Sequence, residues 1–430
     1  MKIVLIGAGS HSFGLGQIAD VLRCKELRGR DVTLALVDEN PDALEVMSRV
    51  AERIRRFYDS DVKLESHTDR RAALPNAQYV IISVARKRFE LWEQDFRLPL
   101  ALGFRHVLGE NGGPGALFHA LRSFELVIPI CRDVEEICPD AFVMNFTNPE
   151  ARVLHAICHL TKVNAAGFCH GVFQAIRRIC KYLDRPEEEL SIVSAGMNHL
   201  YCVMSVRDKT TEEEYLPELV RMAAEETDPH LQLFRTFARV YDLFTFPSDD
   251  HIGEYLAWGT EFHGVAWPYG RESGKVPRNP PPEGDSLRDY AEGRLEGDPH
   301  WAVKGSNELT VPVICDMELD RGSFRDAVNV LNTDGLIENL PRDIVVEVPA
   351  TVDKQGLHPV KVGAIPETLA AFLRPQYTIH GLLTEAYRSR SRKLLLQALL
   401  LDPTMPSTSA AEKLLDEMLK LQSDFLPEFE

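Results

Sequence analysis

Lys2-Ile-Val-Leu-Ile-Gly-Ala-Gly-Ser-His-Ser-Phe-Gly14 combines a short aliphatic strand with a glycine turn, and a helix-patterned segment follows. Glycines in such a turn let the backbone approach a pyrophosphate, which the N-terminus of the next helix stabilises. We therefore expect Gly7, Gly9, Ser10 and Phe13 to contact a dinucleotide. The third glycine of the usual G-x-G-x-x-G pattern is missing, because a serine stands there. Strand-glycine-helix turns also occur for tight packing alone, so a second feature is needed.

An acidic residue at the end of the second strand supplies that feature. Val32-Thr-Leu-Ala-Leu-Val37 has a strand pattern, and Asp38 follows it. An acid at this position is expected to hold an adenosine ribose, and an acid rather than an arginine favours NAD over NADP. The glycine turn and Asp38 together predict an NAD site. Ser83 and Asn145, at the ends of later strands, are further candidate contacts to the cofactor.

Strand and helix patterns alternate through the first half of the chain. Apolar spacing predicts a helix over residues 41–56, a strand over 79–83 and a helix over 117–138. This alternation is typical of an α/β fold with a Rossmann-like, doubly wound parallel sheet. We assign that domain to residues 1–196. Residues 197–430 are expected to form a C-terminal α+β domain for substrate binding and oligomerisation.

The second half of the chain has weaker patterns. Residues 266–300 are rich in Pro and Gly, which predicts a loop or lid with little regular structure. Residues 344–349 return to a strand pattern. Residues 366–373 and 381–402 predict the closing helices.

Three polar clusters each follow an apolar run. They are Asn145-Phe-Thr-Asn-Pro149, Gly167-Phe-Cys-His-Gly171 and Gly196-Met-Asn-His199. If the three runs are neighbouring parallel strands, the clusters meet at one sheet edge, where open α/β sheets bind ligands. A thiol, two imidazoles and several carboxamides would then share one crevice.

Cys169 and His199 are the candidate metal ligands in these clusters. A thiolate and a neutral imidazole suit a divalent transition metal, and two protein ligands leave positions open for substrate hydroxyls. The alternative is a buried free cysteine and a hydrogen-bonded core histidine. Because both residues follow apolar strands in similar polar clusters, the metal interpretation is the better one.

Other polar residues in these segments could bind substrate or move protons. His170 could act as a general acid or could be a surface or helix-capping histidine. Asn145 and Asn148 suit sugar hydroxyls or a nicotinamide amide, or they form the turn before Pro149. The polar loop at 246–255 has room for a proton-transfer group, and Glu110 is a weaker candidate of the same kind.

Composition excludes several functional classes. The 430 residues carry a net charge of −17, which argues against nucleic acid as a partner. The longest apolar runs fall short of a membrane span, and the start of the chain does not look like a signal peptide. The eight cysteines are scattered singly, as in a reduced protein. We expect a cytoplasmic enzyme that acts on a small molecule.

The ordered set of motifs resembles glycoside hydrolase family 4, the NAD- and manganese-dependent glycosidases. The resemblance covers most of the chain and rests on seven pieces in the family's order. These are Gly7-Ala-Gly-Ser10, Asn111-Gly-Gly-Pro-Gly115, Asn145-Phe-Thr-Asn-Pro149, Cys169-His170, Asn198-His199, Glu254-Tyr255, and Val348-Pro-Ala350 with Gly356-Leu-His-Pro359.

The resemblance implies hydrolysis by a redox-assisted elimination. NAD would oxidise C3 of the sugar, Mn²⁺ or another divalent metal would acidify the C2 proton, and a base would remove it. Elimination of the aglycone, addition of water and return of the hydride complete the reaction. The resemblance makes Tyr255 the base, with Asp250 as its substitute, and Asn148 and Glu110 substrate contacts. It also implies a homodimer or homotetramer.

Two sequence features bear on the substrate. Cys169 followed by His170 is similar to family members that cleave α-glycosides without a phosphate. Arg86-Lys-Arg88 is a cationic cluster on an acidic chain, and Arg88 would suit an acidic sugar such as an α-glucuronide or α-galacturonide. The alternatives are a surface loop or contacts to the cofactor pyrophosphate.

Two other functions compete with a glycosidase. An NAD-dependent hydroxy-acid or sugar dehydrogenase explains the first domain, but it explains neither Cys169 with His199 nor the length of the chain. A non-catalytic NAD-binding regulator would leave Cys169 merely buried. Accumulation of NADH would support the dehydrogenase, and the absence of a bound or required metal would support the regulator.

Overall fold

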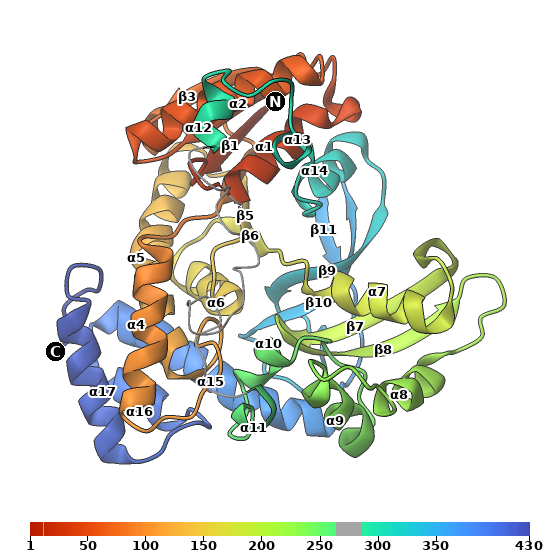
Figure 1. Ribbon diagram of the computed structural model, residues 1–430, viewed down its shortest axis with the longest axis vertical. Helices are drawn as coiled ribbons and strands as arrows, with labels where there is room; N and C mark the ends of the chain where they lie inside the picture. The colour runs from red at the N-terminus through yellow and green to blue at the C-terminus, as the bar shows by residue number, and fades with distance from the viewer. Residues whose placement is uncertain (12, 264–285) are drawn as a thin grey trace.

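A computed structural model describes residues 1–11, 13–263 and 286–430 (Figure 1). Its first half is a parallel sheet in the strand order β3-β2-β1-β4-β5-β6. The strands are β1 (Lys2–Ile6), β2 (Thr33–Val37), β3 (Lys63–His67), β4 (Tyr79–Ile82), β5 (Phe142–Asn145) and β6 (Asn164–Gly167). The expected Rossmann-like sheet is confirmed, although the sequence analysis missed β3, which is mostly polar.

Helices cover both faces of this sheet. Ile3 and Leu5 of β1 pack into one apolar cluster with α1 and α2, while Val4 and Ile6 pack into a second cluster with α5 and α6. Alternate side chains of a strand point to opposite faces, so both faces are buried. The helices of this half are α1 (Phe13–Arg23), η1 (Lys25–Leu27), α2 (Pro41–Phe57), α3 (Arg70–Ala73), α4 (Arg88–Ala101), α5 (Gly113–Ile137), α6 (Glu150–Leu160), α7 (Gly171–Leu183) and η2 (Glu187–Glu189).

The sheet continues without a break into the second half of the chain. Its further strands are β7 (Leu190–Met197), β8 (Leu200–Asp208), β9 (Ser323–Leu331), β10 (Val345–Asp353) and β11 (Gly356–Pro359). The order after β6 is β9-β10-β7-β8, all antiparallel, and β11 pairs with β10. The parallel part therefore ends at Gly167, earlier than expected.

The expectation that the three cluster-bearing strands are parallel neighbours is wrong for the third. β5 and β6 are parallel neighbours, but β9 and β10 lie between β6 and β7, and β7 runs antiparallel to β6. The clusters still converge because β6 and β7 end at one row of residues from opposite directions. That row is Gly167, Asn329, Glu347 and Gly196.

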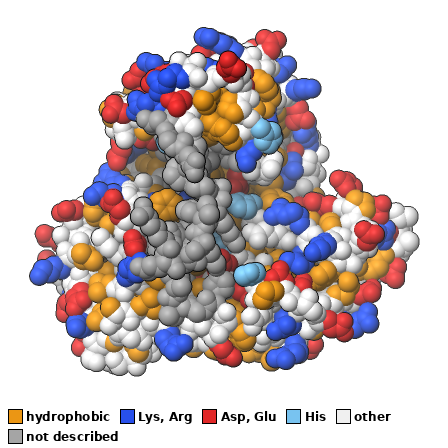
Figure 2. Space-filling view, in the orientation of Figure 1, with side chains coloured by type: hydrophobic (Ala, Val, Ile, Leu, Met, Phe, Trp, Pro, Cys, Tyr) orange, Lys and Arg blue, Asp and Glu red, His pale blue; other side chains and the backbone are white. Residues whose placement is uncertain are grey.

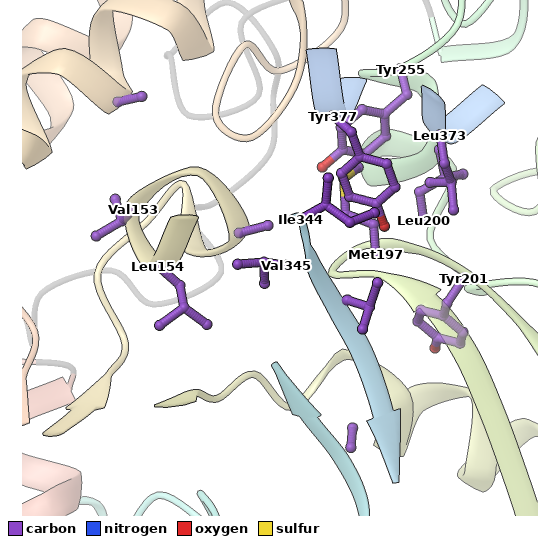
Figure 3. Packing of buried hydrophobic residues seen from close by; sticks show 14 of the residues in the cluster. Val153, Leu154, Met197, Leu200, Tyr201, Tyr255, Ile344, Val345, Leu373 and Tyr377 are labelled. Carbon is purple, nitrogen blue, oxygen red and sulfur yellow. The ribbon is translucent and has the colours of Figure 1, made fainter. Parts of the chain in front are cut away.

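Helices of the second half surround the antiparallel strands. Met197 and Leu200 lie close to Leu373 and Tyr377 of α15, with Ile344 beside them (Figure 3). α15 is one continuous helix where two segments were expected. The helices are α8 (Leu216–Ala224), α9 (Gln232–Tyr241), α10 (Asp249–Gly253), α11 (Thr260–His263), α12 (Ser286–Ala291), α13 (His300–Val303), α14 (Thr310–Leu319), α15 (Glu367–Ser389), α16 (Arg392–Leu400) and α17 (Thr408–Leu421).

The expected lid at 266–300 falls largely outside the described residues, which resume at Ser286. Its described end contains α12 and the start of α13, and it packs on α2. The guanidinium of Arg53 lies 4.4 Å from the ring centre of Tyr290, and Tyr58 donates to the carbonyl of Val303 at 2.7 Å. This end therefore contains two short helices, which the sequence did not predict, joined by irregular structure over residues 292–299, as expected. Within the described residues, every helix is too short or too polar to cross a membrane.

The backbone at Gly7 generates a prediction about stability. Gly7 has φ +92°, and a Cβ there would lie 2.0 Å from the carbonyl oxygen of Ser83. Gly103 has a similar φ of +90° but nothing within 4 Å of a built Cβ. We expect Gly103→Ala to cost about 1–3 kcal/mol from backbone strain alone. Gly7→Ala should cost more and weaken NAD binding, measured by denaturant unfolding and cofactor titration. Equal losses for the two variants would contradict the close approach at Ser83.

Candidate active site

The glycine turn after β1 has the geometry of a dinucleotide cradle. The Gly9 N–H donates to Asp38 Oδ2 at 2.8 Å, and a Cβ on Gly9 would lie 2.7 Å from that oxygen. A Cβ on Gly14 would lie 2.3 Å from the carbonyl oxygen of Ala8. Gly14 therefore supplies the close packing of helix on strand that the third glycine of the motif normally provides. The residues present fit the expected NAD site.

Aromatic rings connect this turn to the second polar cluster. The Phe13 N–H donates to Ser10 Oγ at 3.3 Å, which holds the start of α1 against the turn. The ring centre of Phe13 lies 4.8 Å from that of Phe146, and Phe146 stacks on Phe168 at 5.6 Å. Phe168 directly precedes Cys169, so a row of three aromatic side chains connects the cofactor turn to the thiol.

Cys169 and His199 are brought together as the sequence predicts. Cys169 Sγ and His199 Nε2 lie 3.3 Å apart. Burial raises the pKa of the Cys169 thiol and lowers that of His199, so His199 is neutral and able to ligate. A tetrahedral metal with usual bond lengths needs its sulfur and nitrogen ligands roughly 3.6 Å apart. The pair thus fits a divalent metal after a small movement and loss of the thiol proton.

His251 is a third candidate ligand, in the loop at 246–255 that the sequence pattern predicted for proton transfer and not for metal binding. Its ring centre lies 4.2 Å from that of His199. Ligand atoms of His199, His251 and Glu254 all lie within 4.8 Å of one another. Burial lowers the pKa of His251, but the hydrogen bond to Glu254 and the charge of Asp250 outweigh it and raise that pKa to about 9. A metal would have to displace that proton. The i,i+3 spacing of His251 and Glu254 was the available signal.

Glu254 orients His251 and also holds the second glycine loop. Its Oε1 lies 3.3 Å from His251 Nδ1. Its Oε2 accepts three backbone N–H groups, those of Glu110, Asn111 and Gly112, at 2.7, 2.7 and 3.0 Å. With both oxygens occupied, Glu254 is better placed to orient a ligand than to be one.

A buried carboxylate that sequence reasoning missed lies behind Cys169. Glu347 is 2 % exposed, and its Oε2 accepts from the side-chain amides of Asn198 at 3.1 Å and Asn329 at 3.3 Å. Burial raises the pKa of Glu347 to about 7. Glu150 is also buried nearby, and a Cβ on Gly167 would lie 1.5 Å from its Oε1. A lone acid within the apolar run 344–349 was the signal for Glu347.

The three predicted substrate contacts form one cluster. Glu110 Oε1 accepts from Asn148 Nδ2 and from Arg88 Nη2, both at 3.1 Å. Arg86 instead pairs with Glu39, next to Asp38, at 3.0 Å. The two arginines therefore pair with different acids, Arg88 with Glu110 and Arg86 with Glu39, although both line one hollow.

The remaining predicted residues have different surroundings. Tyr255 is buried, its hydroxyl lies 3.4 Å from the carbonyl oxygen of Asn198, and burial raises its pKa. Asp250 accepts from the His251 N–H at 3.1 Å and from the Ser248 hydroxyl. The Asn145 side chain bonds the backbone of Thr147, at 3.2 and 3.3 Å, and the side chain of Glu150. These contacts match the turn-forming alternative for Asn145, and its contact with the cofactor stays a prediction.

His170 lies at the surface beside the thiol. Its side chain is 60 % exposed, and Nδ1 lies 2.8 Å from Glu308 Oε1. The hydrogen bond to Glu308 raises the pKa of His170. Histidine side chains come to the surface in the hollow between the upper and lower parts of the face shown in Figure 2.

Comparison with known proteins gives one consistent result. Residues 2–185 match the model of the family 4 glycosyl hydrolases, and residues 194–405 match that family's C-terminal domain. The chain is 31% identical to an α-glucosidase of Erwinia rhapontici, over 99% of this chain and 98% of that protein. It is 29% identical to an α-galactosidase of Bacillus subtilis (strain 168), over 100% and 99%.

A solved structure has the same fold. It is a 6-phospho-α-glucosidase from gut microorganisms in complex with NAD and Mn²⁺. Its TM-score is 0.85 at 20% identity, over 100% of this chain and 99% of that one.

The contact between Cys169 and His199 generates a prediction about metal binding. Cys169→Ser removes the soft ligand, so divalent metal affinity should fall more than about 100-fold, because even outer-shell losses cost 10–100-fold. NAD affinity should change little. Isothermal titration with Mn²⁺ measures the first effect and NAD titration the second. Cys180→Ser, on α7, is the matched control. Metal affinity that survives in Cys169→Ser would remove the thiol from the ligand set.

Proposed function

Because this chain belongs to the family 4 glycosyl hydrolases, we propose that it hydrolyses an α-linked, non-phosphorylated hexoside or hexuronide. The α-glucosidase and α-galactosidase at 31% and 29% identity support the α-linkage and the absence of a phosphate. The observation that carries the proposal is the contact between Cys169 and His199 beside a dinucleotide turn. That combination suits a redox-assisted elimination better than the paired carboxylates of most glycosidases.

NAD and Mn²⁺ are the cofactors of this proposal. Gly7, Gly9, Ser10 and Asp38 would hold NAD, and Cys169 and His199 would hold the metal, with His251 available as a third ligand. When bound, NAD accepts and returns a hydride, and the metal acts as a Lewis acid towards the sugar hydroxyls. Asn148, Glu110 and the metal ligands would fix the sugar between them.

The protein's own groups move the protons in the proposed reaction. Tyr255 Oη would take the C2 proton of the sugar, and His170 would donate to the leaving oxygen. Burial and the charge of Glu254 raise the pKa of Tyr255, and the charge of the buried Arg152 offsets only part of that rise, so the phenol must lose its proton before Tyr255 can act as the base. Asp250 remains the alternative base. Its carboxylate already accepts from Ser248 and His251, which supports Tyr255 as the better candidate.

Compartment and assembly belong to the same proposal. All eight cysteines are free in the structure, which suits the reducing cytoplasm.

Three exposed leucines suit an interface between copies in a homodimer or homotetramer. Leu400, Leu401 and Leu421 are 40–51 % exposed on or beside α16 and α17. Light scattering of the purified protein measures the assembly, and a monomer at micromolar concentration would contradict it.

Elimination predicts the fate of the hydrogen at C2. A substrate deuterated at C2 should react more slowly and should yield product that has exchanged the label with ordinary water, because Tyr255 removes this proton. Mass spectrometry of the product and competition kinetics measure the two effects. Full retention of deuterium would contradict the elimination. Accumulation of NADH in step with product would favour the dehydrogenase alternative.

An acidic glycone is a second candidate, favoured by the position of Arg88. Arg88 contacts Glu110 and, with Arg86 and Ser123, lines a shallow hollow, and the Ser123 hydroxyl donates to the Asn148 carbonyl at 2.7 Å. Guanidinium pairs with a sugar carboxylate in a geometry that a neutral hexose leaves unused.

Two arginine variants, one inside the hollow and one outside it, test whether the glycone is acidic. Arg88→Ala should raise KM for an α-hexuronide roughly 10–100-fold, the worth of a charge-assisted hydrogen bond, and should change KM for the neutral hexoside little. Arg374→Ala is the control, because Arg374 pairs with Glu367 at 3.0 Å and does not line this hollow. Equal effects on both sugars, or a wild-type preference for the neutral one, would exclude the acidic glycone.

A further inference from the structure

The contact between His170 and Glu308 joins residues 138 positions apart in the chain. We propose that Glu308 is the positioning residue for His170 during cleavage of the glycosidic bond. This inference rests on the role of His170 as the acid in the proposed function. Glu308 is not expected to touch substrate or cofactor, because it acts on the far nitrogen of the imidazole.

His170 needs an external support. It precedes α7 without a side-chain capping bond, and its side chain is 60 % exposed. A ring in that setting would sample several rotamers. The bond from Nδ1–H to Glu308 Oε1 at 2.8 Å selects one orientation and one tautomer. When the ring is protonated, its Nε2–H is then the group left to donate to the leaving oxygen.

Hydrogen bonds through Ser306 fix the position of Glu308. Its side chain is 10 % exposed, and its backbone N–H donates to Ser306 Oγ at 3.1 Å. The Ser306 N–H donates to Asp20 Oδ2 at 2.9 Å, and the Gln17 amide donates to Ser306 Oγ at 3.1 Å. Asp20 and Gln17 lie on α1, the helix that follows the cofactor turn.

Helix α1 therefore contacts both the dinucleotide turn and the loop that holds Glu308. Its N-terminus faces the dinucleotide turn, and its body carries the loop that ends in Glu308. A Cβ on Gly16 would lie 2.7 Å from Ser306 Cβ, so the loop packs directly on the helix. Through this loop the acid is placed relative to the cofactor by a short chain of side-chain contacts, which is how precise sites are built.

Dependence on the leaving group separates positioning from general stability. The holoenzyme with NAD and Mn²⁺ is assayed on aryl α-glycosides whose phenols span a wide range of acidity, and on an unactivated disaccharide. His170→Ala should lose about 10²–10⁴-fold on the poorest leaving group, the usual worth of an acid, and little on the best. Glu308→Gln should show the same pattern with a smaller loss, about 10–100-fold. Glu308→Asp should recover part of it.

A second His–carboxylate pair provides the matched control. His358 Nε2 lies 2.8 Å from Asp353 Oδ1, at the β10–β11 hairpin. Asp353→Asn breaks an equally short contact and should leave every rate unchanged. A uniform loss over all leaving groups in Glu308→Gln, together with a lowered Tm, would show a structural role and overturn the inference.

The same experiment distinguishes a failure of the acid role of His170 from a failure of the positioning role of Glu308. If His170→Ala shows no leaving-group dependence, the acid of the proposed function is wrong. If His170→Ala shows it and Glu308→Gln does not, only the positioning role fails. ¹⁵N NMR of the His170 ring gives a readout that needs no substrate. In the neutral ring the Nδ1–H tautomer should dominate in the wild type and be lost in Glu308→Ala, which removes the acceptor, and an unchanged spectrum in that variant would overturn the inference.

Discussion

The buried carboxylate of Glu347 is the interaction on which the site depends. It accepts from Asn329 on β9 and from Asn198 after β7, and Asn329 Nδ2 lies 3.5 Å from the carbonyl oxygen of Gly167 on β6. These contacts connect the parallel and antiparallel parts of the sheet at the row where Cys169 and His199 emerge. Burying the charged form of Glu347 is costly, so burial raises its pKa to about 7, and the two hydrogen bonds to Oε2 offset part of that cost.

Much of the first half could be predicted from local sequence. The strand before Gly7, the acid at Asp38 and the helix beginning at Pro41 are short-range signals, and the structure contains each of them. β3 was missed because its sequence, Lys-Leu-Glu-Ser-His, is mostly polar and half exposed. The pairing of β9 with β6 could not be predicted, because the contact between Gly167 and Asn329 spans 162 residues.

The residues of the site also divide into those that have a local sequence signal and those that do not. Cys169 and His199 were found because their residue types are distinctive and each follows an apolar run. Glu308 and Glu347 were not predicted, because the role of each acid depends on a partner that is distant in the sequence. Their partners, His170 and Asn198, are 138 and 149 residues away. Sequence pattern predicts the residues that we propose to react, while the residues that contact and orient them become visible only in the folded chain.

Burial and charge give each proposed metal ligand a different protonation state before any metal binds. Cys169 is held as a thiol and His199 as a neutral imidazole, both by burial, while Glu254 keeps a proton on His251. A divalent cation must therefore release protons as it binds, so its affinity should rise with pH.

The central claim is that Cys169 and His199, brought together from opposite strand directions, hold one metal ion. X-ray absorption spectroscopy of the protein loaded with Zn²⁺ as a probe measures this directly. The account predicts one sulfur at about 2.3 Å and imidazole nitrogen at about 2.0–2.1 Å. A first shell of oxygen and nitrogen alone would contradict it.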